Sequence, residues 1–239
     1  MNKLDPRNIY DDLHQIPELG FEEFKTSAYL ADKLEAMGYK VTRNIGGTGV
    51  IGEIKGSEPG PVMMLRADMD ALPFLIDGEK KNIHACGHDA HSAMLLAAAS
   101  ELVGKVKRGT LRILFQQGEE TLKGALAVID AGVIEDVDIA LGLHIRPVQD
   151  IAYGEMSPAV RHASSTFVNV VINGLSSHGA RPHLGVNAIE AAAVAINAIT
   201  AIKINPIIPW SCKVTGIKGG GVAPNIIPDK VETVSYTHL

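Results

Sequence analysis

The feature that most constrains the fold is a set of three apolar, strand-like runs that each end in carboxylates or an imidazole. These runs are 62–67, followed by Asp68 and Asp70; 111–117, followed by Glu119 and Glu120; and 138–143, followed by His144. In open α/β sheets, ligands bind beyond the carboxyl ends of the strands, where side chains from several strands converge. The pattern therefore predicts an α/β fold with a binding site at one edge of its sheet.

Helical patterns lie among these runs. We expect an amphipathic helix over 21–37, with Phe24 and Leu34 on its apolar face, and further helices over 91–103 and 124–131. Strands that alternate with helices favour a mostly parallel sheet flanked by helices.

The pattern changes after Gly154. An alternating strand is predicted over 166–173, a helix over 186–202, a strand over 211–217 and a further strand from about Lys230. We therefore expect two domains, 1–158 and 159–239. The second has too little surface to bury on its own, so we expect the chain to be incomplete at its C-terminal end.

Composition excludes several classes of function. The 239 residues include 22 Lys and Arg against 27 Asp and Glu, for a net charge of −5, and there is no basic run and few aromatic residues, so we expect no nucleic-acid partner. No secretory signal or membrane-length apolar run is visible, and two cysteines cannot form a disulfide framework. We expect a cytoplasmic protein that does not bind membranes.

One short motif points to a metal. The stretch His84-Ala85-Cys86-Gly87-His88-Asp89-Ala90-His91 holds one thiol and three imidazoles. Together with carboxylates, these are the donors of a transition-metal site, and an additional carboxylate beside a ligand suits metal-assisted hydrolysis. In a continued strand, Glu119 and Glu120 would point to opposite sides. A turn at Gly118 would let one bind metal while the other faces the substrate as a base.

Alternatives remain for single residues. Cys86 could be a small buried hydrophobe, His88 or His91 could merely hydrogen-bond the helix start, and Asp89 could be a helix cap or a partner of a ligand imidazole. Cys86 could also be a covalent nucleophile, although that hypothesis leaves the Glu pair and His144 without roles. The G-x-G-x-x-G match at 47–52 leads into a strand, so we interpret it as the entry to a hairpin and not as a dinucleotide site.

With these residues in place, the chain resembles the metal-dependent amidohydrolases that include aminoacylases, hippurate hydrolase and indole-acetyl-amino-acid hydrolases. The matching stretches, in order, are 14–19, 66–72, 84–91, 115–120, 142–144, 177–183 and 225–229. Two departures are evident. The family usually has Pro-Ala where this chain has Gln117-Gly118. It also continues past Asp229 through the rest of a lid domain and back to the catalytic domain, which supplies a last histidine ligand.

The resemblance implies a role for each site residue. The ligands of a site for one or two metal ions per subunit would be Cys86, His88, Glu120 and His144. Their mixed sulfur, nitrogen and oxygen donors allow Zn, Mn, Co or Ni. Glu119 would be the general base. From their places in the sequence, and apart from the resemblance, we expect Asp68 and Asp89 to support the ligands. His178 would reach the reacting carbonyl from the lid, in the same subunit or across a dimer, and Asn225 would hold the substrate carboxylate.

The resemblance also implies the architecture and the reaction. Residues 1–158 would belong to a zinc-peptidase-like catalytic domain, and 159–239 would form part of an inserted α+β ferredoxin-like lid that also makes a homodimer. The expected activity is hydrolysis of N-acyl amino acids or similar small amides by metal-activated water. A rival hypothesis is a non-catalytic remnant whose metal is structural or absent and which only binds a partner.

Overall fold

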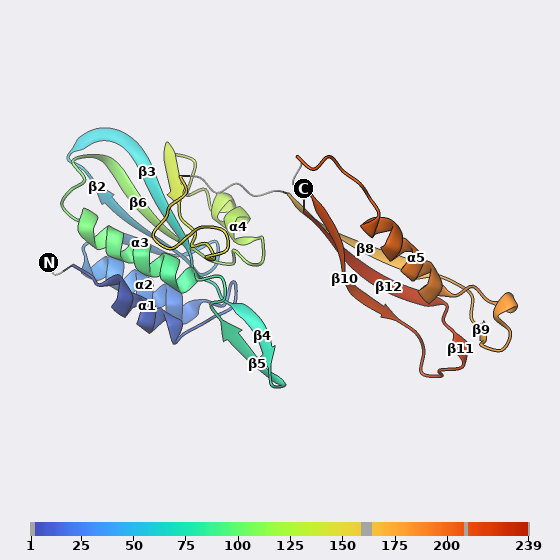
Figure 1. Cartoon of the computed structure of the whole chain (residues 1–239). Helices are drawn as coiled ribbons and strands as arrows, with labels where there is room; N and C mark the ends of the chain where they lie inside the picture. Colours follow the sequence, from blue (N-terminus) through green and yellow to red (C-terminus); the bar gives the residue numbers. More distant parts are fainter. Residues whose placement is uncertain (1–2, 159–163, 208–209, 239) are drawn as a thin grey trace. The chain divides into compact units, whose positions relative to one another are not determined.

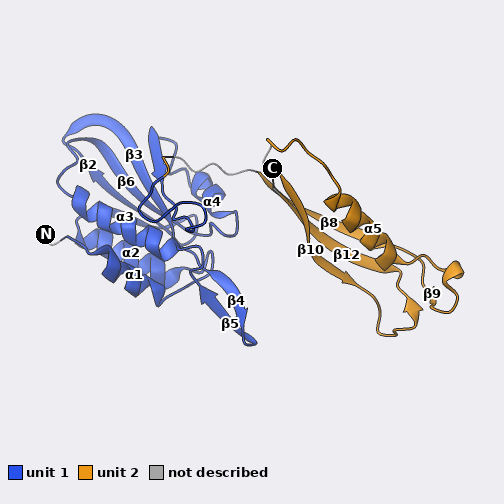
Figure 2. Ribbon diagram, viewed as in Figure 1, with its two compact units in different colours: residues 1–156 blue, residues 157–239 orange. Residues whose placement is uncertain are grey.

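The computed structural model describes residues 3–158, 164–207 and 210–238. The chain divides into two compact units, residues 1–156 and 157–239 (Figure 2). The domain boundary expected from the sequence, between 158 and 159, adjoins residues 159–163, which lie outside the described part.

Unit 1 contains a five-stranded sheet in the order β1-β2-β6-β3-β7 (Figure 1). Its strands are β1 (Lys40–Ile45), β2 (Gly49–Lys55), β3 (Glu58–Asp68), β6 (Arg108–Gln116) and β7 (Ile139–Gly142). Strand β3 runs parallel to both β6 and β7, while β1 and β2 add an antiparallel edge. The predicted α/β class is confirmed. The 47–52 motif enters β2 from the turn of the β1–β2 hairpin, as interpreted from the sequence.

Helices cover both faces of this sheet. They are α1 (Pro6–His14), α2 (Phe24–Ala36), α3 (His88–Leu102) and α4 (Gly124–Asp130). Alternate residues of β6 point to opposite faces, so Phe115 packs in one core with residues of α1, α2 and α3, while Leu114 packs in another with Val128 of α4. The carboxyl ends of β3 and β6 thereby lie between two packed layers.

The structure corrects the sequence prediction for α2. The helix begins at Phe24, three residues later than expected, and Phe24 is 67% exposed, whereas Leu30 and Leu34 are fully buried. Glu23, the residue before the helix, is fully buried, whereas the sequence pattern had placed Phe24 on the buried face. Its carboxylate bonds to groups of other loops, which fixes how the chain enters the helix.

Several elements were not expected from the sequence. Helix α1 starts at Pro6 after Asp5, whose side chain accepts a hydrogen bond from the backbone N–H of Arg7. Strand β1 and the hairpin of β4 (Leu72–Ile76) and β5 (Glu79–Ile83) were also missed. Among the described residues, no helix has the length and apolar character needed to cross a membrane.

Unit 2 is an antiparallel sheet packed against one helix (Figure 1). The strands β8 (Ser165–Asn173), β10 (Ser211–Gly219) and β12 (Lys230–His238) are in the order β10-β12-β8. Helix α5 (Ala188–Thr200) is capped by Asn187, whose side chain accepts from the backbone of Ile189 and Glu190. A short ribbon of β9 (Ser177–His178) and β11 (Ile226–Ile227), with a 3-10 turn at Pro182–Leu184, completes the unit.

Candidate metal centre

The start of helix α3 places two of the predicted ligands. Cys86 and His88 flank Gly87, which is the N-cap residue of α3 and has a left-handed conformation with φ +80°. Because the helix begins at His88, Asp89 lies inside its first turn and is not its cap. The left-handed residue redirects the chain between the thiol and the imidazole.

The predicted ligands come together around this helix start. Donor atoms of Cys86, His88 and Glu120 all lie within 4.8 Å of one another. The Nε2 atom of His144 lies 3.4 Å from the Cys86 sulfur. The Nδ1 atom of His144 donates to the carbonyl of Ile145, so the lone pair of Nε2 faces the thiol. The cluster therefore joins the α3 start, the turn after β6 and the loop after β7.

Two buried atoms of this cluster have no hydrogen-bond partner. They are Nε2 of His88 and Oε1 of Glu120, and these side chains approach to 3.8 Å. Burial raises the pKa of Glu120, and the negative charges of Glu119 and Asp70 raise it further. His88 and Cys86 act in the opposite direction and lower this pKa. A cation between these groups would satisfy both orphaned atoms and offset the buried negative charge. A thiol, an imidazole and a carboxylate fit a divalent transition metal.

The orientation of His88 is fixed by Asp70. Its Nδ1 donates to Oδ1 of Asp70 at 3.1 Å, which turns Nε2 toward Cys86 and Glu120. Burial alone would lower the pKa of His88, but the hydrogen bond to Asp70, the neighbouring Cys86 thiol and the charges of Asp68 and Asp70 raise it to about 11. A carboxylate behind a ligand imidazole is the usual support of a metal-binding histidine.

His91 has a different role from His88. A second group of potential donors consists of Asp68, His88, His91 and His144. However, Nδ1 of His91 donates to Asp68 at 2.5 Å and its Nε2 accepts from the backbone N–H of Ile145 at 2.9 Å. Both nitrogens are therefore used, and His91 holds the loop that carries His144. The sequence left open whether His88 or His91 has a structural role. In the structure, His91 is the one whose two ring nitrogens both make structural hydrogen bonds.

Of the two aspartates expected to support the ligands, Asp68 lies 3.6 Å from Nε2 of His88, and Asp89 lies beside His14. Asp68 bonds to His91 and, at 2.9 Å, to Arg66. Although burial opposes it, the hydrogen bond from His91 and the charges of His88 and Arg66 lower the pKa of Asp68 to about 2. Asp89 accepts from Nδ1 of His14 at 2.6 Å. The residue that does bond to the ligand His88 is Asp70. The sequence placed Asp70 at the end of a strand but assigned it no role, and the only sign of one was its position two residues after Asp68.

The expected turn before the Glu pair is present. Gly118 has φ +57° and ends the extended path of β6, so Glu119 and Glu120 follow in a turn. Carboxylate oxygens of both residues lie 3.8 Å from Nε2 of His88, and the Glu119 side chain is the more exposed, at 37% against 22%. Glu119 therefore combines closeness to the cluster with access to solvent.

The predicted residues of the second unit lie beside one another. His178 pairs with Ile226 in the β9–β11 ribbon, and the backbone N–H of Gly179 donates to the carbonyl of Asn225 at 2.7 Å. Nδ1 of His178 accepts from the backbone N–H of Ala180 at 3.1 Å. Both His178 and Asn225 are exposed, so the ribbon presents an imidazole and an amide to solvent.

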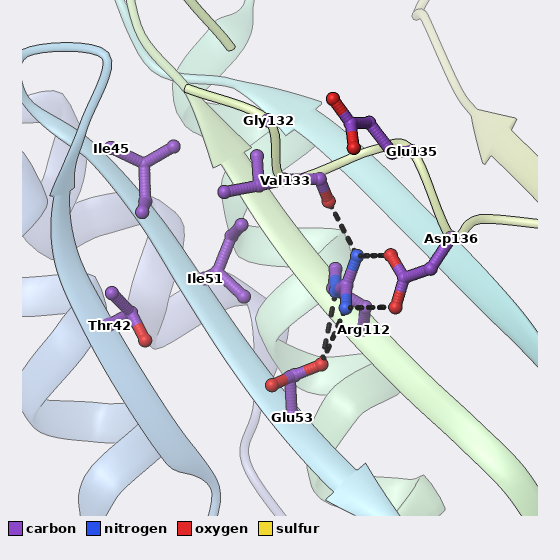
Figure 3. Close-up of a pocket in the computed structure, with 9 residues that line it drawn as sticks. All are labelled: Thr42, Ile45, Ile51, Glu53, Arg112, Gly132, Val133, Glu135 and Asp136. Atoms are coloured by element: carbon purple, nitrogen blue, oxygen red, sulfur yellow. Dashed lines mark hydrogen bonds and ion pairs between the residues drawn. The ribbon is translucent and has the colours of Figure 1, made fainter. Parts of the chain in front are cut away.

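A separate hollow of about 310 Å³ lies over β1, β2 and β6 (Figure 3). Its charged lining residues are Arg112, Glu53, Glu135 and Asp136, and Arg112 bonds to Asp136 at 2.7 Å and to Glu53 at 2.9 Å. None of the cluster residues lines it. Arg112, the one cation among these lining residues, is paired with two carboxylates, so the hollow offers no free positive charge to an anionic ligand.

A model of peptidase family M20/M25/M40 matches residues 64–227, which include all four clustered donors as well as Glu119, His178 and Asn225. The chain belongs to peptidase family M20/M25/M40. The match spans both units, so the predicted resemblance is confirmed beyond the metal-binding motif.

Individual proteins of known name agree with this membership. Thermostable carboxypeptidase 1 of Saccharolobus solfataricus is 38% identical over 92% of this chain and 60% of its own length. Hippurate hydrolase of Campylobacter jejuni is 37% identical over 92% of this chain and 61% of its own length. The crystal structure of the YXEP protein of Bacillus subtilis, described as a dinuclear metal binding peptidase of the M20 family, has a TM-score of 0.77 and 31% identity over 98% of this chain and 63% of that one. The chain thus spans about 60% of the length of these relatives.

We predict that Gly118→Ala will destabilise unit 1 and lower its metal content. A non-glycine residue in this left-handed conformation costs about 1 kcal/mol, and the new Cβ would lie 2.5 Å from the Phe21 ring. Urea unfolding and metal analysis of the dialysed protein measure both effects.

Gly132→Ala is the matched control. Gly132 has φ +68°, but the nearest atom to a new Cβ is 3.8 Å away. The control should show only the backbone cost. Equal losses of stability in the two variants would contradict the steric role of Phe21.

Proposed function

We propose that the chain forms the metal-binding part of an amidohydrolase that cleaves N-acyl amino acids or similar small amides. The observation that carries this proposal is the pair of orphaned buried atoms, Nε2 of His88 and Oε1 of Glu120, beside the partly exposed carboxylate of Glu119. A cation site next to a free carboxylate is the arrangement that hydrolysis by activated water requires.

Four side chains would hold the metal: Cys86, His88, Glu120 and His144. Their donors allow one or two Zn, Mn, Co or Ni ions. When bound, the metal supplies a Lewis acid that polarises the amide carbonyl and makes water more acidic. Asp70 keeps Nε2 of His88 directed at the site, and His91 does the same for the loop of His144 through Ile145.

Glu119 would move the proton. Its carboxylate is close to the ligands and partly open to solvent, so it can take a proton from the attacking water and then give it to the leaving nitrogen. His178 would donate a hydrogen bond to the oxyanion that develops on the carbonyl, and Asn225 would bind the substrate carboxylate. Their adjacent, exposed positions on the β9–β11 ribbon support a joint role.

The relatives and the chemistry support proposals for the substrate, the assembly and the location of the protein. The similarity to a hippurate hydrolase supports an N-acyl amino acid as substrate. We propose that unit 2 acts as the lid and forms a homodimer, so that His178 serves either its own subunit or the partner. We further propose that the protein acts in the cytoplasm, in keeping with its two free cysteines.

One observation favours a second candidate. The contact of 3.4 Å between Cys86 and His144 would also suit a cysteine nucleophile with a histidine base. In that mechanism Glu119 and Glu120 have no task, and His88 keeps an orphaned nitrogen. Metal analysis separates the two candidates.

We predict that Glu119→Gln will keep the metal and lose activity. The amide has the shape of the carboxylate but cannot accept the proton, which should reduce kcat by about a hundred- to ten-thousand-fold. Hydrolysis of hippurate by the metal-loaded full-length protein measures the rate, and elemental analysis checks occupancy. Undiminished turnover at full occupancy would refute the assigned role.

We predict that Cys86→Ser and His144→Ala will each lose metal on dialysis, because each change removes a donor. Cys212→Ser, a change at the other free cysteine, is the control and should retain it. If both cluster variants keep their full metal content while alkylation of Cys86 abolishes activity, the cysteine nucleophile becomes the better explanation.

We predict that His178→Ala will lower kcat by roughly a hundredfold or more without changing metal content, because an oxyanion donor is lost. Mixing His178→Ala with Glu119→Gln subunits tests whether His178 acts across a dimer. Partial recovery of activity supports that version, and no recovery despite proven subunit exchange excludes it. A change in thermal stability alone would contradict any catalytic role.

A further inference from the structure

Two buried carboxylates hold the turn that carries the Glu pair. The backbone N–H of Glu120 donates to Oδ2 of Asp70 at 2.9 Å, and that of Gly118 donates to Oε1 of Glu23 at 2.8 Å. Glu119 thus lies between two amides that are each fixed by an anionic acceptor. Hydrogen bonds to charged groups are stronger than those between neutral groups.

Glu23 is an unusual residue for this position. It is fully buried, 95 residues before Gly118 in sequence, and directly precedes α2. Its side chain makes no capping hydrogen bond to that helix. Its other oxygen accepts from the hydroxyl of Thr48, which is also buried. The carboxylate is therefore directed at the β6 turn and the β1–β2 turn, away from its own helix.

A second bond joins the same two turns. Gln117 is fully buried, and its Nε2 donates to the carbonyl of Gly46 at 2.8 Å. The β1–β2 turn therefore contacts both residues that precede the Glu pair, directly at Gln117 and through Glu23 at Gly118. This contact gives the glycine-rich entry to β2 a role that its sequence did not reveal.

We propose that Glu23 is a positioning residue for Glu119 and Glu120, acting through the Gly118 amide and supported by Thr48. Burial of a carboxylate raises its pKa, and the bonds from Thr48 and Gly118 oppose that cost. A turn held in this way keeps the base and the ligand at fixed separations from His88. This inference rests on the proposed function of the Glu pair, while Glu23 itself touches neither substrate nor metal.

The test uses Glu23→Met, which keeps the length of the side chain and removes both acceptors, and Glu23→Gln, which keeps one. Hydrogen exchange of the metal-free chain measures the opening of 117–122. Titration with Co²⁺, followed by thiolate-to-cobalt absorption from Cys86, measures metal affinity. Glu53→Gln is the matched control, because Glu53 is a partly buried carboxylate that bonds only to Arg112 among the described hydrogen bonds.

We expect Glu23→Met to accelerate exchange at 117–122 and to weaken cobalt binding by about tenfold or more each, since a buried donor loses its partner. Glu23→Gln should restore most of both, and Glu53→Gln should change neither. Unchanged exchange at 117–122 in Glu23→Met would overturn the proposal. So would equal acceleration throughout β6, because that result indicates a general structural role.

If Glu23→Met does not fold, Thr48→Val decides. It removes the hydroxyl donor to Glu23 and should accelerate exchange at 117–122 alone, by less than tenfold; no local change would overturn the proposal. Cys86→Ser separates this inference from the proposed function. If wild type and Cys86→Ser give the same cobalt spectrum, the proposed metal site is wrong, whereas the exchange data still decide whether Glu23 holds the turn.

Discussion

The candidate site depends on the carboxylate of Asp70. One oxygen accepts from the imidazole of His88 and the other from the backbone N–H of Glu120, so a single planar group sets the separation between the start of α3 and the turn after β6. Asp70 is 1% exposed, and a charge buried so completely is tolerated only when its oxygens are bonded. The parallel pairing of β3 with β6 delivers this carboxylate and the turn to the same edge of the sheet.

Three aspartate–imidazole pairs surround that edge, and they differ in what the second ring nitrogen does. Asp70 holds His88, Asp68 holds His91, and Asp89 holds His14. The second nitrogen of His91 accepts from a backbone amide, and the side chain of His14 is 45% exposed. Only His88 combines burial with a free nitrogen directed at a thiol and a carboxylate. The same local motif thus gives one candidate ligand and two structural contacts.

The sequence was sufficient to predict that the candidate ligands meet at one edge of the sheet. It was not sufficient to predict which residues hold those ligands in place. Apolar runs that end in Asp68, Glu119 and His144 predicted a common sheet edge because strand polarity follows from the α/β pattern. They could not show which aspartate supports His88, since residues two apart share a face of a strand. Glu23 was missed for another reason. Inside an amphipathic pattern a charge indicates the solvent face, and its partner, Gly118, is 95 residues away.

The left-handed Gly87 links two segments that are distant in sequence. A side chain at this position would meet the end of Ile145 at 2.2 Å, and Ile145 is the residue whose backbone is bound by His91. The space between Cys86 and His88 is therefore filled from the loop that follows β7. Positions 87 and 145 should consequently vary together. A residue larger than glycine at position 87 fits only if the side chain at position 145 is smaller than isoleucine, and it would also carry the strain of a left-handed backbone conformation. The Cys86-Gly87-His88 geometry therefore depends on the loop after β7 as well as on the loop that contains these three residues.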